Sequence, residues 1–244
     1  MIHFITYGDN KYAKTKKRLC DEANSVGWFD TITAYGQDDL DLDFQNKFKD
    51  ILILPRGSGY WIWKPYIIRK HLEKIKENDI LIYLDSGCSI NPSGIDRFKE
   101  YIEMLNNSDS GCISFQLDSN MLKCYEKQWT NKEIFDYFNV EINGDIAKSS
   151  QILATVIILK KNKNSINIVD LWLKTVHDKP ILFTDDYNNN NKGRCEYIEN
   201  RHDQSVFSII RKLYGSILLP EETYFIFGSE YSLKFPFWAT RIRG

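Results

Sequence analysis

The sequence contains little that would direct the protein to an oxidising compartment or into a membrane. Its five cysteines are scattered and form no C-x-x-C pair, and residues 1–10 lack the long apolar region of a signal peptide. No apolar run approaches the roughly 20 residues that cross a bilayer. We therefore expect reduced thiols and a cytoplasmic location, with any membrane contact being peripheral.

An excess of charge of one sign is also missing. The net charge is -1 over 244 residues, with 27% charged and 43% apolar residues, a balance typical of a globular protein. This balance argues against a nucleic-acid-binding or disordered protein, although local basic patches remain possible. The length is sufficient for one large domain, or two tightly fused halves, with a sizeable core. An anionic ligand would therefore need a local binding site.

Several well-known catalytic motifs are absent. The sequence contains no G-x-G-x-x-G, H-E-x-x-H or G-x-S-x-G motif, and no set of Cys and His residues with metal-ligand spacing. Dehydrogenase, zinc-protease and serine-hydrolase functions therefore have no support from motifs. His71 lies in an amphipathic stretch and His177 near a predicted helix end, so we expect both to be structural.

What the sequence does contain is an alternation of short apolar runs and amphipathic stretches, which is typical of an α/β fold. The predicted strands are HFITY (3–7), ILIL (51–54), ILIYL (80–84), CISF (112–115) and LATVIIL (153–159). The predicted helices are KTKKRLCDEANSV, KPYIIRKHLEKIKEN, IDRFKEYIEMLNN and SINIVDLWLKTV. Because ILIYL is apolar throughout, we expect it to be a strand covered on both faces.

Asp85 stands directly after the ILIYL run and is followed by Ser86 and Gly87. It is therefore expected at the carboxyl end of a central strand, where open α/β sheets bind their ligands. A carboxylate there, next to a glycine that lets a ligand approach the backbone, suits a divalent cation shared with a diphosphate. The alternative is that Asp85 only accepts hydrogen bonds from turn amides.

A second polar stretch, RGSGYWIWKPYIIRK (56–70), opens a predicted helix. Its two glycines, Lys64 and flanking arginines can present amides and positive charge to phosphate oxygens, but the spacing is not that of a P-loop. Its aromatic residues can stack on a base or a sugar, or they can belong to the core. We expect at least one of the two tryptophans, Trp61 and Trp63, to be core.

A third stretch, residues 199–225, predicts another helix. Its expected buried face consists of Val206, Ile210 and Leu213. Its first turn carries His202, Asp203 and Gln204. Asp203 can be an N-terminal cap, or the three polar groups can form a sugar-binding or general-base site.

Three other segments are less regular. Residues 116–150 are richer in polar residues, with a short helix expected around 132–138. TDDYNNNNKGR (184–194) is expected to be an exposed, mobile loop, either without function or acting as a lid over a cleft. The final EYSLKFPFWATRIRG (230–244) is aromatic and basic. It is too short to fold alone, so it must pack on the body or remain mobile.

Together these stretches resemble the GT-A-fold glycosyltransferases. GYWIWKPYII followed by NDILIYLDSGC is similar to small bacterial and large-DNA-virus sugar transferases, and HDQSVF with YGSILLP is similar to the D-Q segment of glycogenin-type enzymes. The resemblance runs from about His3 to Phe225 and is most specific between Gly57 and Asn91. If the source is viral, the expected location is the host cytoplasm.

The resemblance implies a single α/β domain over residues 1–244, with a Rossmann-like, mixed, mostly parallel sheet flanked by helices. Within it we expect a nucleotide-sugar-binding half of about residues 1–115 and an acceptor-side half of about residues 116–225, followed by a C-terminal tail of residues 226–244.

Roles for individual residues also follow from the resemblance. Asp85 would bind the metal and Asp203 would lie near the acceptor sugar or the anomeric carbon, so these two are the catalytic candidates. The candidates for nucleotide-sugar binding are Thr6, Tyr7, Gly8, Lys64, Arg69, Asp85, Ser86 and Gly87. The candidates for acceptor or sugar binding are Ser150, Gln151, His202 and Gln204.

The metal site departs from the family pattern at one position. In such enzymes a strand-end D-x-D binds a divalent metal, usually manganese, which holds the diphosphate of a nucleotide sugar; here the second position is Gly87. Three options follow: a one-carboxylate metal site helped by another residue, a metal-independent mechanism in which Lys64 or Arg69 neutralises the diphosphate, or an inactive relative. Cys88 is a poor ligand for hard magnesium. We expect Mn²⁺, or Mg²⁺, as the cofactor.

The implied function is transfer of a hexosyl or deoxyhexosyl group from a nucleotide-sugar donor, preferably a UDP-sugar with guanosine left open, to a glycan acceptor. The alternative is a catalytically inactive glycan- or nucleotide-binding module of the same fold. A third hypothesis, a metal-dependent phosphohydrolase, needs an acid at position 87. If transfer inverts configuration, a carboxylate such as Asp203 deprotonates the acceptor hydroxyl; if it retains configuration, Asp203 only orients substrate.

Overall fold

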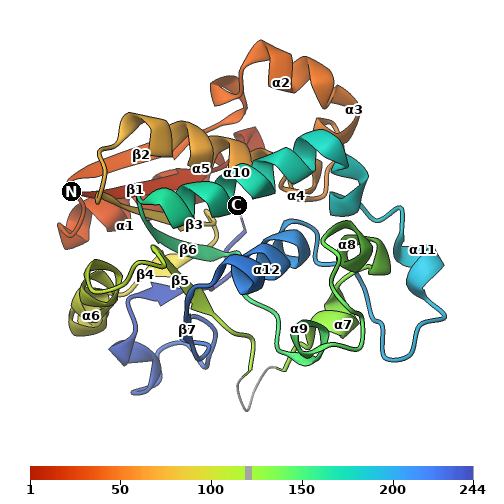
Figure 1. Ribbon diagram of the computed structural model, residues 1–244. Coiled ribbons are helices and arrows are strands. Elements are labelled where there is room, and N and C mark those ends of the chain that lie inside the picture. The colour runs from red at the N-terminus through yellow and green to blue at the C-terminus, as the bar shows by residue number, and fades with distance from the viewer. Residues whose placement is uncertain (119–122, 244) are drawn as a thin grey trace.

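A mixed six-stranded sheet forms the centre of the computed structural model, which describes residues 1–118 and 123–243 (Figure 1). The strands are Ile2–Tyr7 (β1), Thr31–Tyr35 (β2), Ile80–Leu84 (β3), Cys112–Phe115 (β5), Val156–Lys160 (β6) and Ile217–Leu219 (β7). Their order is β2-β1-β3-β6-β5-β7. β6 is antiparallel to β3 and β5, whereas the other neighbours pair in parallel. The predicted mixed, mostly parallel α/β sheet is confirmed. Residues 119–122 of the predicted acceptor half and 244 of the tail lie outside the described residues.

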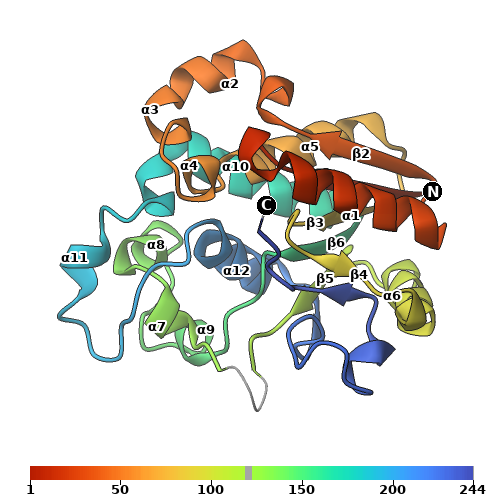
Figure 2. The same cartoon turned by 180° about the vertical axis from the view of Figure 1, so that it is seen from behind.

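Helices cover both faces of this sheet, as the two opposite views show (Figures 1 and 2). The longer helices are Ala13–Val26 (α1), Trp63–Lys74 (α5), Ile95–Asn106 (α6), Lys163–Asp178 (α10) and Asp203–Tyr214 (α12). The shorter helices are Leu42–Lys47 (α2), Lys49–Leu52 (α3), Gly57–Tyr60 (α4), Glu126–Trp129 (α7), Lys132–Tyr137 (α8), Asp145–Lys148 (α9) and Asn188–Asn191 (α11). Turns of 3₁₀ helix occur at Asn10–Tyr12, Gln37–Asp39, Pro92–Gly94, Pro180–Phe183 and Ser232–Lys234.

The alternation of side chains along the strands divides the core between the two faces of the sheet. Leu81 packs in the cluster that contains Ile68 of α5 and residues of α10 and α12. Its neighbour Ile82 packs in the opposite cluster with Leu19 of α1 and residues of α6. All five residues of β3 are buried, as predicted for ILIYL. This central strand therefore holds the residue that follows it, Asp85, in a fixed place.

Two local predictions are wrong. ILIL was expected to be a strand, but Ile51 and Leu52 lie in α3 and Ile53 is 77% exposed, because four apolar residues alone do not distinguish a strand from a short helix. The edge strand β2 is instead formed by TITAY, whose short pattern was not singled out.

The second wrong prediction concerns the buried face of α12, where Leu213 is 44% exposed. Phe207, which was not assigned to the buried face, is fully buried and stacks on Trp172 with ring centroids 3.8 Å apart.

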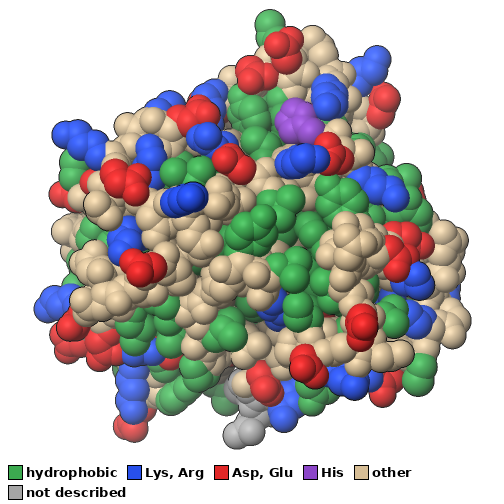
Figure 3. All heavy atoms as spheres, in the orientation of Figure 1, with side chains coloured by type: hydrophobic (Ala, Val, Ile, Leu, Met, Phe, Trp, Pro, Cys, Tyr) green, Lys and Arg blue, Asp and Glu red, His purple; other side chains and the backbone are tan. Residues whose placement is uncertain are grey.

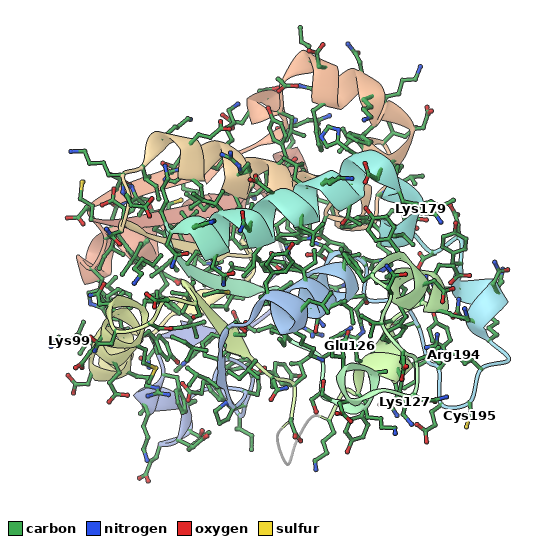
Figure 4. All side chains as sticks on the ribbon, viewed as in Figure 1. Lys99, Glu126, Lys127, Lys179, Arg194 and Cys195 are labelled. Atoms are coloured by element: carbon green, nitrogen blue, oxygen red, sulfur yellow. The ribbon has the colours of Figure 1, made fainter. Side chains whose placement is uncertain are left out.

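The segment 184–194 is tied to the body rather than fully exposed. Arg194 donates hydrogen bonds to the carbonyl oxygens of Lys127 and Thr130, and Figure 4 shows Arg194 and Lys127 on the same side of the molecule. Asn191 is 3% exposed, and its Oδ1 accepts a hydrogen bond from the Lys132 amide at 2.8 Å. The expectation of an exposed loop is therefore wrong for the part of the segment near Asn191, where the buried Asn191 side chain is hydrogen-bonded to the start of α8.

The C-terminal tail packs on the rest of the domain, which was one of the two arrangements expected from the sequence. Phe237–Trp238 (β8) pairs in antiparallel fashion with Ser89–Ile90 (β4). Phe237 is buried against Phe98 of α6, with ring centroids 6.0 Å apart. Figure 2 shows the tail, in blue, running beside β4 toward the end of β3. The last described residues are thereby brought close to Asp85.

The outer surface fits the composition. Acidic and basic side chains are interspersed over the face shown in Figure 3, and the five cysteines all carry free thiols. In the part of the chain that the structure describes, no helix is both long and apolar enough to cross a membrane.

Candidate active site

A cavity of about 450 Å³ opens at the carboxyl ends of β1 and β3. These two strands pair in parallel, so they end at the edge of the sheet where α/β folds place their ligands. The lining comes from segments within residues 7–12, 56–64, 83–88, 154–155, 199–204 and 241–243. Segments that are far apart in the sequence therefore meet around Asp85.

A buried lysine joins the two predicted catalytic carboxylates. Lys64 Nζ lies 3.1 Å from Asp85 Oδ1 and 2.7 Å from Asp203 Oδ2. It also donates a hydrogen bond to the Ala154 carbonyl oxygen at 3.3 Å. The side chains of Lys64 and Asp203 are 2% and 7% exposed, whereas that of Asp85 is 30% exposed. Asp85 is therefore the most accessible of the three charged groups.

The three charges change one another's proton affinity. Burial raises the pKa of Asp203 to about 6; the Lys64 ammonium opposes this shift and the Asp85 carboxylate adds to it. Burial lowers the pKa of Lys64, but the two carboxylates more than compensate, so its pKa is raised and the ammonium stays charged. Asp203 thus changes its protonation state near pH 6, in the range that suits a proton acceptor working at neutral pH.

Residues 57–61 form a left-handed turn along one wall of the cavity. All five have positive φ, from 51° at Ser58 to 94° at Gly59. A Cβ on Gly59 would lie 2.7 Å from the Leu52 Cα, so a larger residue would clash there as well as being strained. The non-glycine residues of the turn each incur a cost on the order of 1–3 kcal/mol. Strain of this kind concentrates at functional sites, and this turn is next to the buried Lys64.

Aromatic rings hold the turn in place. Trp63 is buried, stacks on Tyr7 with ring centroids 3.6 Å apart, and donates from Nε1 to the Gly57 carbonyl oxygen at 2.9 Å. Trp61 is only partly buried and stacks on His202 with centroids 5.7 Å apart. The expectation that at least one tryptophan is core is confirmed by Trp63. Both rings also contribute to the cavity lining.

His202, directly before α12, offers an unused hydrogen-bond acceptor. Its Nδ1 lies 2.9 Å from the Phe183 carbonyl oxygen, which can only accept, so Nδ1 carries the proton. Burial lowers the pKa of His202 to about 4, with the Arg56 charge adding to the shift, and the ring is therefore neutral at pH 7. Nε2 is buried and has no hydrogen-bond partner among the described residues. It can accept a hydrogen bond from a ligand hydroxyl, as the predicted role of His202 requires.

Ser150 and Gln151 were expected at the sugar but lie outside the cavity lining. Gln151 is fully buried, and its Nε2 donates to Glu126 Oε1 at 3.1 Å, where Glu126 lies beside α12 (Figure 4). Its Oε1 accepts a hydrogen bond from Gln204 Nε2 at 2.7 Å. Gln204 does line the cavity. Gln151 therefore orients Gln204 and has no contact with the cavity itself.

Thr6 and Arg69 were expected at the donor and also lie outside the lining. Thr6 is fully buried, and its hydroxyl donates to the Leu84 carbonyl oxygen at 2.8 Å. Arg69 is paired with Glu73 at 3.0 Å and with Asp170 of α10, because packing of the apolar face of α5 turns it away from the cavity. The other candidates for donor binding line the cavity: Tyr7, Gly8, Lys64, Asp85, Ser86 and Gly87.

The described residues fit a divalent cation poorly. They contain no group of three His, Cys, Asp or Glu side chains placed to hold a metal. The two carboxylates that could share a cation already share the Lys64 ammonium. Burial raises the pKa of the Cys88 thiol well above its usual value, which disfavours the thiolate that would bind a metal. Of Asp85 and Asp203, Asp85 is the more exposed and is the one that could contact a cation held largely by phosphates and water. The Mn²⁺ or Mg²⁺ cofactor stays a prediction.

Gly87, where the family pattern has its second acid, is covered by the C-terminal tail. The Ile242 amide donates to the Gly87 carbonyl oxygen at 2.9 Å, and the Thr240 hydroxyl donates to the same oxygen at 2.8 Å. A Cβ at position 87 would lie 2.9 Å from the Ile242 carbonyl oxygen. Any side chain at this position would have to displace the tail, which is a physical reason for glycine here.

No protein-family model and no curated protein matches this sequence significantly. Solved structures with a similar arrangement include a glycosyltransferase involved in the glycosylation of the major capsid of PBCV-1, with 14% identity and a TM-score of 0.48 over 97% of this chain and 92% of that chain. They also include the apo-form glycosyltransferase GlyE of Streptococcus pneumoniae TIGR4, with 15% identity and a TM-score of 0.42 over 90% of this chain and 45% of GlyE. Mouse xyloside xylosyltransferase 1 is 10% identical, with a TM-score of 0.41 over 98% and 97% of the two chains.

These three proteins are glycosyltransferases, the class that the sequence resembles. All three identities lie below 25% and all three TM-scores below 0.5, and likeness at this level does not decide an activity.

Four arginines line the cavity in addition to the predicted donor- and acceptor-binding residues, and one of them, Arg56, was expected as a flanking arginine of the stretch 56–70. They are Arg56, Arg201, Arg241 and Arg243. Arg56 and Arg201 lie 3.9 Å and 3.4 Å from the Glu199 carboxylate. The basic character of the tail was a signal for Arg241 and Arg243. What the sequence did not indicate is the part of the body against which the tail packs.

Proposed function

We propose that this chain is a glycosyltransferase that moves a hexosyl or deoxyhexosyl group from a nucleotide-diphosphate donor to a hydroxyl of a glycan acceptor. The observation that carries the proposal is the contact of Lys64 with both Asp85 and Asp203 inside the cavity at the end of β3. At about 450 Å³, the cavity is in the size range of small-molecule sites. The resemblance of the sequence around Asp85 and Asp203 to GT-A enzymes supports the same function.

The donor would lie across the ends of β1 and β3. Tyr7 and Gly8 would border the nucleoside at the end of β1, and Ser86 and Gly87 would border the diphosphate beyond β3. Uridine is the preferred base from the sequence resemblance alone. Guanosine stays the alternative, so the identity of the base is the first property to measure.

Departure of the nucleotide diphosphate leaves negative charge near Asp85, and positive charge placed there in advance lowers the barrier. Lys64 supplies one ammonium, but Asp85 and Asp203 already neutralise it. Additional positive charge must therefore come from the arginines that line the cavity or from a bound cation. If a divalent ion takes part, Asp85 is the residue that would hold it, and the ion would neutralise charge on the leaving phosphate.

Asp203 is the group suited to accept a proton. With a pKa of about 6 it is mainly ionised at neutral pH, and it is still basic enough to take the proton of an attacking hydroxyl. This role applies if transfer inverts the configuration of the sugar. If the configuration is retained, Asp203 orients a substrate hydroxyl and keeps Lys64 in place.

The acceptor side would be formed by the residues before and at the start of α12. His202 Nε2 can accept a hydrogen bond from a sugar hydroxyl. Gln204, held by Gln151 through a 2.7 Å hydrogen bond, would contact the same sugar. Both residues belong to the segment that resembles the D-Q pattern.

We also propose that the enzyme works in the cytoplasm, since its five cysteines are unpaired, as expected in a reducing compartment. Peripheral contact with a membrane-bound glycan acceptor is compatible with this location. Fractionation of cells that express the full chain would test both points.

The first experiment is a thermal-shift panel of UDP, GDP, CMP and their common sugar conjugates, each with and without manganese. A ligand at about 100 times its dissociation constant stabilises the folded state by roughly 2.7 kcal/mol, which is measurable as a rise in Tm. We expect one diphosphate to stabilise the protein. A shift only with manganese would support the metal prediction, and a shift without it would place the neutralising charge on the protein.

Donor turnover then separates the possible functions. Release of nucleotide diphosphate that depends on a glycan acceptor supports the proposed transfer. Nucleotide binding without turnover under any condition would favour the catalytically inactive binding module. Release of inorganic phosphate would instead point to a phosphohydrolase. The matched control is Asp203→Asn, which keeps the shape of the side chain and removes its charge.

A further inference from the structure

The C-terminal tail forms part of the cavity wall next to Asp85. Thr240 and Ile242 are anchored to the carbonyl oxygen of Gly87, two residues after Asp85. The Thr240 hydroxyl also lies 3.1 Å from the Ser89 hydroxyl, and β8 pairs with β4 just before the tail reaches the cavity. Arg241 and Arg243 flank the anchored Ile242, and both line the cavity.

These two arginines differ from the other cations of the cavity in their partners. Lys64 is held by Asp85 and Asp203, and Arg56 and Arg201 lie near Glu199. Neither Arg241 nor Arg243 makes an ion pair within residues 1–118 and 123–243. The Arg241 guanidinium lies 5.5 Å from the centroid of the Tyr224 ring, an arrangement that orients the charge without neutralising it.

The backbone adds a second indication. Arg241 has a φ of 55°. A non-glycine residue adopts this left-handed conformation at a cost of order 1–3 kcal/mol, and residues strained in this way are concentrated at functional sites. The surrounding anchors at Gly87 keep it there. An arginine held in such a conformation, open to a cavity and without a carboxylate partner among the described residues, is suited to an anionic ligand.

We propose that Arg241 and Arg243 bind the diphosphate group of the donor, so that the C-terminal tail is part of the donor site. The tail packs on Gly87, the position where the family pattern has its second acid. In place of a carboxylate that binds a metal cation, the tail would supply the guanidinium groups of Arg241 and Arg243. This inference rests on the proposed function, because it assigns the group that neutralises the leaving diphosphate. It also extends to any nucleoside diphosphate or pyrophosphate that enters the cavity.

The test compares the Arg241→Ala/Arg243→Ala variant with the wild-type chain in titrations with UDP, GDP and inorganic pyrophosphate. Binding is measured by calorimetry, once with manganese and once with EDTA. The matched control is Lys99→Ala/Lys179→Ala, which removes the same charge from two exposed residues away from the cavity lining (Figure 4). A third variant, Arg241→Lys/Arg243→Lys, keeps the charge and loses the planar donor group.

We expect the double alanine variant to bind the preferred diphosphate about tenfold more weakly for each arginine removed, as charge-assisted hydrogen bonds imply. The control should bind like the wild type, and the lysine variant should lie between. The affinity of the wild type should also fall more steeply with salt than that of the alanine variant. Unchanged melting curves would show that the variants fold.

Donor turnover measured on the same proteins separates failure of this inference from failure of the proposed function. If the wild type transfers sugar and the alanine variant has the same affinity for donor as the control, the tail does not bind the diphosphate and the function stands. If no sugar is transferred but diphosphate binding depends on the two arginines, the anion site stands and the function fails. If the wild type binds none of the three anions, the inference is overturned.

Discussion

Lys64 Nζ lies 2.7 Å from Asp203 Oδ2, and neither side chain is more than 7% exposed. The pair joins the first turn of α5 to the first turn of α12, two helices that cover the same face of the sheet. A buried ion pair of this kind is costly to break on one side only, because the remaining charge is left without a partner.

Replacing Lys64 by methionine should destabilise the fold by about 3–5 kcal/mol, the typical cost of leaving a buried charge unpaired. Methionine keeps most of the side-chain length and removes the ammonium, so Asp203 loses its partner. The free energy of unfolding from urea titrations measures the effect. The double variant Lys64→Met/Asp203→Asn should regain part of the loss; a double variant less stable than Lys64→Met would contradict the pairing.

The rate of transfer should fall below pH 6. Burial raises the pKa of Asp203 to about 6, so the carboxylate is protonated below that pH and no longer accepts a proton from the acceptor. In an inverting enzyme kcat/KM should then drop about tenfold per pH unit, and Asp203→Asn should lower kcat by about 10²–10⁴-fold. A flat profile between pH 5 and 7 would remove Asp203 from proton transfer.

The free energy of unfolding should also depend on the protonation of Asp203, but here the protonated form is the favourable one. Since the pKa of Asp203 is raised in the folded state, its contribution is fully present below the unfolded value of about 3.9 and is lost as pH rises through about 6. In Asp203→Asn this part of the pH dependence should disappear. Unfolding titrations at pH 4, 5, 6 and 7 compare the two proteins. Identical pH dependence in both would mean that Asp203 titrates normally.

Asp85→Ala should abolish transfer while leaving the protein folded. Asp85 is the most exposed of the three charged groups that meet at Lys64, and the residue after β3 carries little of the core packing. Turnover of donor and the melting temperature are measured together. A variant with unchanged activity would take Asp85 out of the mechanism, whereas an unfolded variant would assign it a structural role.

Arg69→Ala should leave transfer unchanged, although the sequence placed Arg69 at the donor. Its guanidinium is paired with Glu73 and Asp170 outside the cavity lining, and such partly exposed pairs contribute about 0–1 kcal/mol to stability. Steady-state kinetics with varied donor measure the effect. A clear rise in the KM for donor would show that Arg69 reaches the diphosphate after all.

Gly59→Ala should destabilise the left-handed turn by more than about 1 kcal/mol. Gly59 has a φ of 94°, and the new Cβ would lie 2.7 Å from the Leu52 Cα. Gly193→Ala is the control, because a Cβ there meets nothing within 4 Å. Thermal unfolding of the two variants decides the point: equal stability would mean that the turn at 57–61 tolerates a side chain and is not strained.

Much of the fold could be predicted from local patterns. The apolar run Ile80–Leu84 is a central strand buried on both faces, and Asp85 follows at its carboxyl end. Ile68 and Leu72 of α5, and Ile75 directly after it, are all buried, as the i, i+4, i+7 spacing of these apolar residues in KPYIIRKHLEKIKEN predicts. Such features depend on the period of a strand or helix, which neighbouring residues encode. The ILIL run failed for the same reason, since four apolar residues fit either period.

Local patterns along the chain were enough to predict the α/β alternation, the position of Asp85 after a buried strand and the placement of Asp203 at the start of a helix. The packing of distant segments was needed to show that Lys64 lies between these two carboxylates and that Arg69 points away. It was also needed to show that the tail closes over Gly87 and brings Arg241 and Arg243 to the cavity. These contacts depend on how the apolar faces of distant segments pack against one sheet. Spacing along the chain records which face a residue occupies, but not which residue from another segment lies opposite.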